Sequence, residues 1–222
     1  MSKLSRHLFG TAPCMVVGMV LTAAAPAFAQ TAAPTPVAPA PAAAPAAAAG
    51  CAGLAALQAR RADIDKVTAL LRDGLAPAST LTSLYSDAAN ELDAALAGTD
   101  YDSACYRSIA AEVTAMDAAD GDDVSPAASV GSALSSSIAK SCEKQTTVEG
   151  IKTCLSDTVA SVADGTYAEG YLIRVLRALP IETVKPDDAQ TREILEYVKG
   201  EVAAERMTTN QQNDLTKRLL GL

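Results

Sequence analysis

Four of the five cysteines have a spacing that could do chemistry, namely Cys51, Cys105, Cys142 and Cys154, whereas Cys14 falls inside an apparent N-terminal export signal. Zinc sites and thioredoxin-like redox centres use closely spaced Cys-x-x-Cys pairs, and none occurs here. An even set of cysteines in an exported chain favours structural disulfides, with three connectivities open. Cys142 and Cys154 flank a predicted turn near Thr146, where antiparallel helices would bring them to similar heights. We therefore expect these two to pair, which leaves Cys51 for Cys105.

Histidine is absent from the sequence beyond an N-terminal export signal, since the only one is His7. The absence excludes a Ser-His-Asp or Cys-His site, a histidine-ligated metal and the attachment motif of c-type haem. The serine run at 135–137 has no histidine to activate a hydroxyl, and no glycine-rich phosphate-binding motif is present. We therefore expect a protein that is not an enzyme, with no catalytic residue, cofactor or metal.

Carboxylate chemistry is what remains for an enzyme, for example a single glutamate acting on a glycan of the cell wall. The sequence does not select among the candidates, and its six tyrosines offer few aromatic platforms for a glycan. The candidate carboxylates are Glu91, Glu112, Glu169 and Glu182.

A run of aspartates follows the third predicted helix and comprises Asp117, Asp120, Asp122 and Asp123. Such a run could hold Ca²⁺, but its order does not match the alternating oxygen ligands of an EF-hand. We interpret it as a solvated loop between helices.

Two tyrosine pairs, Tyr101 with Tyr106 and Tyr167 with Tyr171, lie at predicted helix starts. They could form a shallow aromatic patch for a partner or a glycan. Tyrosines at such places more often seal the edge of a core or anchor a loop, and we favour that interpretation.

The N-terminus has the features of an export signal. Lys3 and Arg6 precede an apolar stretch at 14–25, and Ala27-Phe28-Ala29 fits a small-x-small cleavage site. We predict a cleaved signal at residues 1–29 and expect an exported protein that resides in the periplasm, with the extracellular space and the cell surface as the alternatives. The alternative is a lipid anchor at Cys51, because residues 48–51 resemble a lipoprotein box, although it lies far from the apolar stretch.

Residues 30–50 are almost only alanine and proline, which predicts a linker with nothing to bury. Removing the signal takes away two basic residues and no acidic ones, so the net charge of −8 becomes about −10. A strongly acidic chain argues against nucleic acid and anionic membrane surfaces as partners. It favours solubility and a basic protein partner.

From Cys51 onward, apolar residues recur every three or four positions, which predicts helix nearly throughout and no sheet. Proline and capping residues mark several starts, among them Ser125-Pro126 and the capping boxes Thr146/Glu149 and Thr166/Glu169. The last helix would be capped within 209–212. The expected helices span about 53–72, 77–97, 100–120, 126–142, 146–164, 166–179, 186–202 and 209–219.

The predicted fold is therefore an all-α, alanine-rich, disulfide-stapled bundle of about seven or eight helices. The bundle would occupy residues 51–180, and a C-terminal helical extension at 181–222 would pack on it or project from it. A core of thin side chains implies close helix crossings, which would explain Gly131, Gly150 and Gly170 inside helices unless these are surface glycines.

The leading functional hypothesis is a non-catalytic protein-interaction or assembly module of the bacterial cell envelope. The alternatives are a carrier of small molecules or lipids, with an apolar cavity of more than ~300 Å³ between helices, and a carboxylate-dependent cell-wall enzyme. The partner would be an envelope or periplasmic protein, and no membrane insertion is expected after signal cleavage. The predicted partner-binding residues are Ile194, Leu195, Tyr197, Val198 and Val202.

Overall fold

The computed structural model describes residues 50–120 and 127–222, and no side chain of residues 118–120. Several predictions fall outside the described residues. These are the signal at 1–29, all of the linker except Gly50, the helix start at Ser125-Pro126, and the side chains of Asp120, Asp122 and Asp123.

The described residues form helices and no strand, which confirms the predicted all-α class. Eight of these helices have ten residues or more, and α7 has four. They are α1 (Ala52–Arg72), α2 (Ala78–Leu96), α3 (Ser103–Asp120), α4 (Ala128–Glu143), α5 (Val148–Ala163), α6 (Glu169–Ala178), α7 (Ile181–Val184), α8 (Asp188–Ala203) and α9 (Thr209–Leu220).

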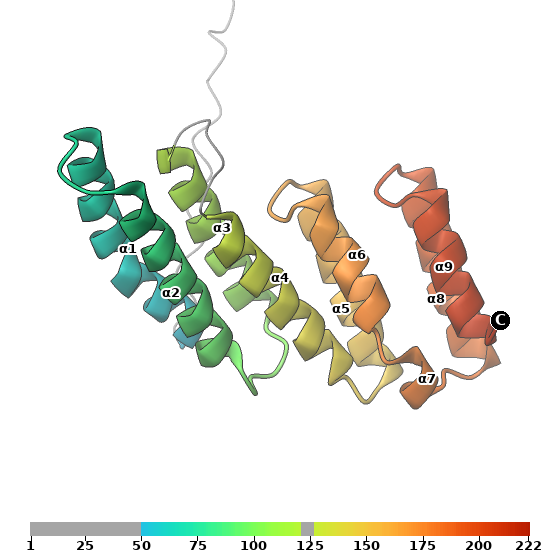
Figure 1. The fold of residues 1–222 in the computed structure, drawn as a ribbon. Coiled ribbons are helices and arrows are strands. Elements are labelled where there is room, and N and C mark those ends of the chain that lie inside the picture. The colour runs from blue at the N-terminus through green and yellow to red at the C-terminus, as the bar shows by residue number, and fades with distance from the viewer. Residues whose placement is uncertain (1–49, 121–126) are drawn as a thin grey trace, which may run out of the picture. The chain divides into compact units, whose positions relative to one another are not determined.

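The long helices pair as hairpins, α1 with α2, α3 with α4, α5 with α6 and α8 with α9 (Figure 1). Helices α2, α4, α6 and α9 follow one another in one layer, and α1, α3, α5 and α8 follow one another in the other. Within the compact unit of residues 43–222, the bundle is therefore a two-layer stack of hairpins. The core lies between the layers, where Leu134, Ile138 and Leu155 are fully buried.

Two disulfides hold neighbouring helices together. Cys51, the residue before α1, bonds Cys105 of α3, and their Cα atoms are 5.4 Å apart. Cys142 of α4 bonds Cys154 of α5 across the intervening turn, with Cα atoms 5.8 Å apart. This is the expected pairing. A Cys51 sulfur bonded in this way is not free to carry a lipid thioether.

Helices pack closely at Gly53 in the first turn of α1. A Cβ atom built there would lie 2.9 Å from Ile109 Cδ1, 2.9 Å from Leu96 Cδ2 and 3.0 Å from Leu92 Cδ1. Only a residue without a side chain lets α1 approach α2 and α3 so closely. By contrast, a Cβ at Gly170 would meet nothing within 4 Å, so close packing does not explain that glycine.

Several helix starts differ from the predicted ones by a few residues. α5 is capped by Thr147, whose hydroxyl accepts the Gly150 N–H, and not by Thr146. The predicted box at Thr166 does not form, because the Thr166 N–H is donated to Asp164 and α6 begins only after Ala168. Capping boxes form instead before α8, at Asp187 with Gln190, and before α9, at Thr208 with Gln211.

The hairpins α5–α6 and α8–α9 turn through a left-handed residue at the same position. This residue is Gly165 after α5, with φ 79°, and Glu205 after α8, with φ 59°. Two residues later, Tyr167 and Met207 are both buried. The two turns thus share one backbone conformation, although only one has the residue that adopts it without steric cost.

The C-terminal hairpin packs on the third one. α8 contacts α5 and α9 contacts α6, and α7 fills the connection. Arg218 of α9 donates hydrogen bonds to the backbone carbonyls of Leu176 and Leu179 at the end of α6, and also to the Glu182 carboxylate of α7. The extension at 181–222 is therefore attached through its polar as well as its apolar side chains.

Candidate functional site

Two adjoining grooves lie between α4 and α6, in the layer formed by the second helix of each hairpin. The first, which we call the tyrosine groove, has a volume of about 500 Å³. The second, the arginine groove, has a volume of about 690 Å³. Both include Arg174, which lies where they meet. The tyrosine groove is lined by Val113, Gly131, Ser132, Tyr167, Tyr171 and Arg174 among others, and the arginine groove by Ser136, Lys140, Lys144, Arg174, Arg177 and Arg218 among others.

The grooves exist because α4 presents small side chains to α6. Along this face the lining residues recur every three or four positions: Ala128, Gly131, Ser132, Ser135, Ser136 and Ala139. Residues with this spacing share one face of a helix. Since α4 has 16 residues, the face runs about 24 Å at 1.5 Å per residue. Short side chains over this length leave an open channel beside α6.

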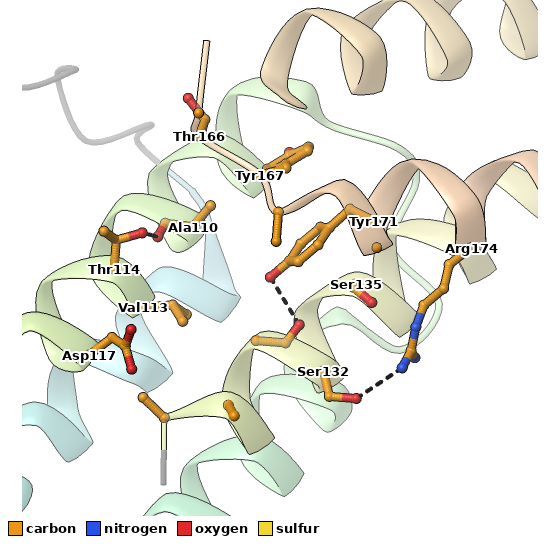
Figure 2. A pocket seen from close by; sticks show the side chains of 16 residues that line it. Ala110, Val113, Thr114, Asp117, Ser132, Ser135, Thr166, Tyr167, Tyr171 and Arg174 are labelled. Carbon is orange, nitrogen blue, oxygen red and sulfur yellow. Dashed lines mark hydrogen bonds between the residues drawn. The ribbon is translucent and has the colours of Figure 1, made fainter. Parts of the chain in front are cut away.

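Stacked tyrosine rings close one end of the tyrosine groove. The ring centroids of Tyr167 and Tyr171 are 5.0 Å apart and their planes differ by 17°. The Tyr171 hydroxyl donates to the Gly131 carbonyl across the groove at 2.9 Å (Figure 2). Burial raises the pKa of Tyr171 to about 12, so this hydroxyl stays protonated at neutral pH. The contact fixes the spacing between α4 and the start of α6.

Of the two interpretations of the tyrosine pairs, the structure favours core edges and loop anchors. Tyr106 and Tyr167 are buried, and each is in ring contact with a half-buried partner, Tyr101 and Tyr171 respectively. Tyr171 and Tyr101 keep part of their surface in grooves. They therefore offer edges of rings to a ligand and no open aromatic platform.

Arg174 is held at the junction of the grooves by neutral oxygen atoms. Its Nη1 donates to Ser136 Oγ at 2.6 Å and its Nη2 donates to Ser132 Oγ at 3.2 Å. Figure 2 shows the guanidinium extending from α6 over α4 to reach Ser132. No carboxylate of the described residues forms an ion pair with it. The guanidinium is therefore held in one orientation, but no described carboxylate neutralises its charge.

The other basic side chains of the arginine groove fall into two groups. Lys140 pairs with Asp93 at 2.8 Å, and Arg218 pairs with Glu182 at 2.8 Å. The Arg218 hydrogen bond lowers the pKa of Glu182, which keeps this carboxylate ionised. The side chains of Arg177 and Lys144, in contrast, form no hydrogen bond or ion pair with any described residue.

The four candidate carboxylates do not gather at one site. Glu91 is bonded by Arg60, at 2.8 Å from Nε, and this bond lowers the pKa of Glu91. Glu112 pairs with Arg61 at 2.8 Å. Glu169 lines a separate groove of about 270 Å³ between α6 and α9. A general acid needs a raised pKa, whereas arginine partners lower the pKa of both Glu91 and Glu182.

The predicted partner-binding residues do not form one exposed face. Ile194 and Val198 are buried in the core, because they lie on the side of α8 that faces α5 and α9. Leu195, Tyr197 and Val202 are half-buried. The apolar spacing of α8 therefore indicates the side that packs in the core. Ile194 and Val198 are not accessible to a partner.

Metal and membrane features are not found in the described part of the chain. Among those residues no group of three or more histidine, cysteine or acidic side chains could hold a metal ion. Asp117, the one member of the acidic run whose side chain is described, lines the tyrosine groove. No helix in 50–120 or 127–222 is long and apolar enough to cross a membrane. The arginine groove is lined mainly by polar residues and alanine, whereas the small groove between α6 and α9 includes Ile173, Leu176 and Leu215 in its lining.

Comparison of the chain with protein-family models, with curated proteins and with solved structures finds no match.

Proposed function

We propose that this protein is an exported, non-catalytic protein-interaction module of the bacterial cell envelope, and that its partner binds along the α4–α6 grooves. The observation that carries the proposal is the pair of adjoining grooves, of about 500 and 690 Å³, that share Arg174. Specific interfaces bury roughly 800 Å² on each partner. Two grooves that meet at Arg174 along one helix provide the hollowed centre that such an interface needs.

The chemistry of the lining supports binding rather than catalysis. Hydroxyls of Ser132 and Ser136, ring edges of Tyr171 and the guanidinium of Arg174 meet along the channel. Tyrosine and arginine are enriched where protein interfaces concentrate their binding energy. Neither groove holds a nucleophile beside a base, which is the arrangement that covalent catalysis requires.

Export is supported by the sequence features of the N-terminus together with two cysteine pairs at disulfide distance. Disulfides persist in oxidising compartments and are rare in the cytosol. A fold in which each helical hairpin is joined to the next by a disulfide or by hydrogen bonds suits a protein that has to stay folded outside the cell.

The proposal is tested by blocking the channel. Ala139 is half-buried in α4 and lines the arginine groove, so Ala139→Trp fills the groove without adding charge. The tagged protein and the variant are each incubated with the native envelope fraction and washed with salt, and the bound proteins are identified by mass spectrometry. We expect one stoichiometric protein partner with the unmodified chain and its loss with Ala139→Trp.

The matched control is Ala62→Trp on the exposed side of α1, which lines none of the described grooves. It should retain the partner. Thermal unfolding establishes that both variants fold, and Ser132→Tyr at an exposed groove position replaces Ala139→Trp if that variant does not. A partner that binds the unmodified chain and a folded, groove-filled variant equally would reject this location.

A further inference from the structure

The arginine groove is positively charged, although the whole chain has a net charge of −8. The basic residues that line it are Lys140, Lys144, Arg174, Arg177 and Arg218, and the acidic ones are Glu143 and Glu182. The groove thus concentrates basic side chains on an acidic protein. A local field of this kind decides which charge sign a groove attracts, whatever the net charge of the chain.

Three of these cations are left without a carboxylate. The structure pairs Lys140 with Asp93 and Arg218 with Glu182. Arg174 bonds only serine hydroxyls, and the side chains of Arg177 and Lys144 bond no described residue. Elsewhere the arginines Arg60, Arg61, Arg107 and Arg206 all pair with acidic side chains.

Arg174 is also positioned for a second acceptor. A guanidinium has five N–H donors, and the two serine bonds use two of them. Ser136 and Ser132 lie one turn apart on α4, so together they fix the plane of the guanidinium over the groove. A carboxylate that meets an arginine held in this way forms a charge-assisted and often bidentate hydrogen bond.

The spacing of the free cations fits an extended peptide. Arg174 and Arg177 are three residues apart on α6, and side chains with this spacing on a helix lie about 5–6 Å apart at Cβ. In an extended strand, side chains on one face repeat every two residues, or about 6.8 Å. Alternate residues of the strand can therefore each reach one arginine. At about 3.4 Å per residue, seven residues span the length of α4.

We propose that the arginine groove binds an acidic segment of a partner protein in extended conformation, with alternate carboxylates on Arg174 and Arg177 and a further one near Lys144. The inference rests on the proposed function, because it names the chemistry of the partner for that same site. It also reverses the expectation of a basic partner, since the charge of the groove differs in sign from the charge of the chain.

The experiment uses a fluorescein-labelled hepta-glutamate peptide and the full mature chain, with fluorescence anisotropy at low ionic strength. We expect saturable binding that weakens as salt rises to about 0.15 M, where charges are screened beyond about 8 Å. The variant Arg174→Gln with Arg177→Gln should bind about tenfold more weakly, which corresponds to about 1.4 kcal/mol. Hepta-lysine and hepta-glutamine peptides should not bind.

The matched control removes the same charge elsewhere. Arg192→Gln with Lys199→Gln changes two exposed cations of α8 that line none of the described grooves. At 0.15 M ionic strength this double variant should bind hepta-glutamate within about twofold of the unmodified chain, because charges more than about 8 Å away are then largely screened. Equal weakening by both double variants would overturn the proposal, since the effect would then follow net charge and not the groove.

The failure of this inference can be told apart from the failure of the proposed function. If hepta-glutamate does not bind but Ala139→Trp still abolishes capture of the envelope partner, the site stands and its partner is not acidic. Binding to vesicles that contain anionic phosphatidylglycerol tests whether the groove takes a lipid headgroup instead. Vesicle binding lost in Arg174→Gln with Arg177→Gln, without any peptide binding, would overturn the proposal in favour of a lipid headgroup.

Discussion

The N-terminal helices and the C-terminal hairpin of this protein are stabilised by different means. α1 is fixed by the Cys51–Cys105 disulfide and by the contact of Gly53 with side chains of α2 and α3. The hairpin α8–α9 has no cysteine. It relies on two capping boxes and on Arg218, which bonds the end of α6.

This difference shows how a core without phenylalanine or tryptophan can be completed in two ways. Close packing gains dispersion energy, but an added atom forces the neighbouring side chains to shift. Polar caps and hydrogen bonds satisfy the helix ends and tolerate exposed substitutions, because each contributes only about 1 kcal/mol. The N-terminal region should therefore respond sharply to small changes, whereas the C-terminal hairpin should respond weakly.

The largest expected effect comes from removing a disulfide. Its contribution rises with the length of the closed loop, and the sequence separations are 54 for Cys51–Cys105 and 12 for Cys142–Cys154. On the chain-entropy model, Cys51→Ala with Cys105→Ala should lower the free energy of unfolding by about 4 kcal/mol, and the other pair by about 3 kcal/mol. Urea unfolding monitored by circular dichroism measures both. A larger loss for the shorter loop would show that side-chain packing, and not loop closure, dominates.

A glycine-to-alanine exchange should have opposite signs in the two regions. Gly53→Ala places a methyl group against three core side chains, and overpacking of this kind costs roughly 1–3 kcal/mol. Gly200→Ala in α8 meets nothing within 4 Å. It should raise stability by about 0.5–1 kcal/mol, through helix propensity. Thermal unfolding of the two variants side by side tests the comparison, and stabilisation by Gly53→Ala would contradict it.

The smallest effect is expected at the hairpin turns. Glu205 occupies the left-handed conformation that Gly165 adopts in the preceding hairpin. Glu205→Gly should relieve the steric cost and raise stability by about 0.5–1 kcal/mol, whereas Gly165→Ala should lower it by about 1 kcal/mol. Hydrogen exchange of the α9 amides reports the first change, and that of the α6 amides the second. If Glu205→Gly destabilises the protein, its side chain has a role in the turn that outweighs the backbone cost.

The sequence predicts the helices better than their ends. Apolar residues spaced by three and four locate all eight long helices, because that periodicity follows directly from burial of one face. The caps were misplaced by one residue at Thr146 and by two at Thr166. Thr146 and Thr147 have equal capping ability. Thr166 belongs to the turn after α5, where its N–H is donated to Asp164 and the next residue, Tyr167, is buried. The four-residue α7 was not predicted.

The candidate site could not be predicted from the sequence for a different reason. The sequence shows the small residues of α4, such as Ser135 and its neighbours. They line a groove only because α6 packs beside α4, and the sequence does not predict that contact. The net charge of the chain is opposite in sign to the charge of the arginine groove, because most of the acidic residues, which outnumber the basic ones, lie outside that groove. The apolar residues Ile194 and Val198 were placed at the surface although they pack in the core.

The position of the first disulfide also has a mechanical consequence. Cys51 is the residue at which the chain joins the helices, and it is covalently tied to Cys105 in α3. Tension applied to the chain before Cys51 therefore passes directly to α3, and the segment between the two cysteines carries no load. Tension applied at the end of α9 reaches no disulfide until Cys154 in α5. A protein pulled from both ends should yield first at α9 and α8, while α1 and α2 stay folded.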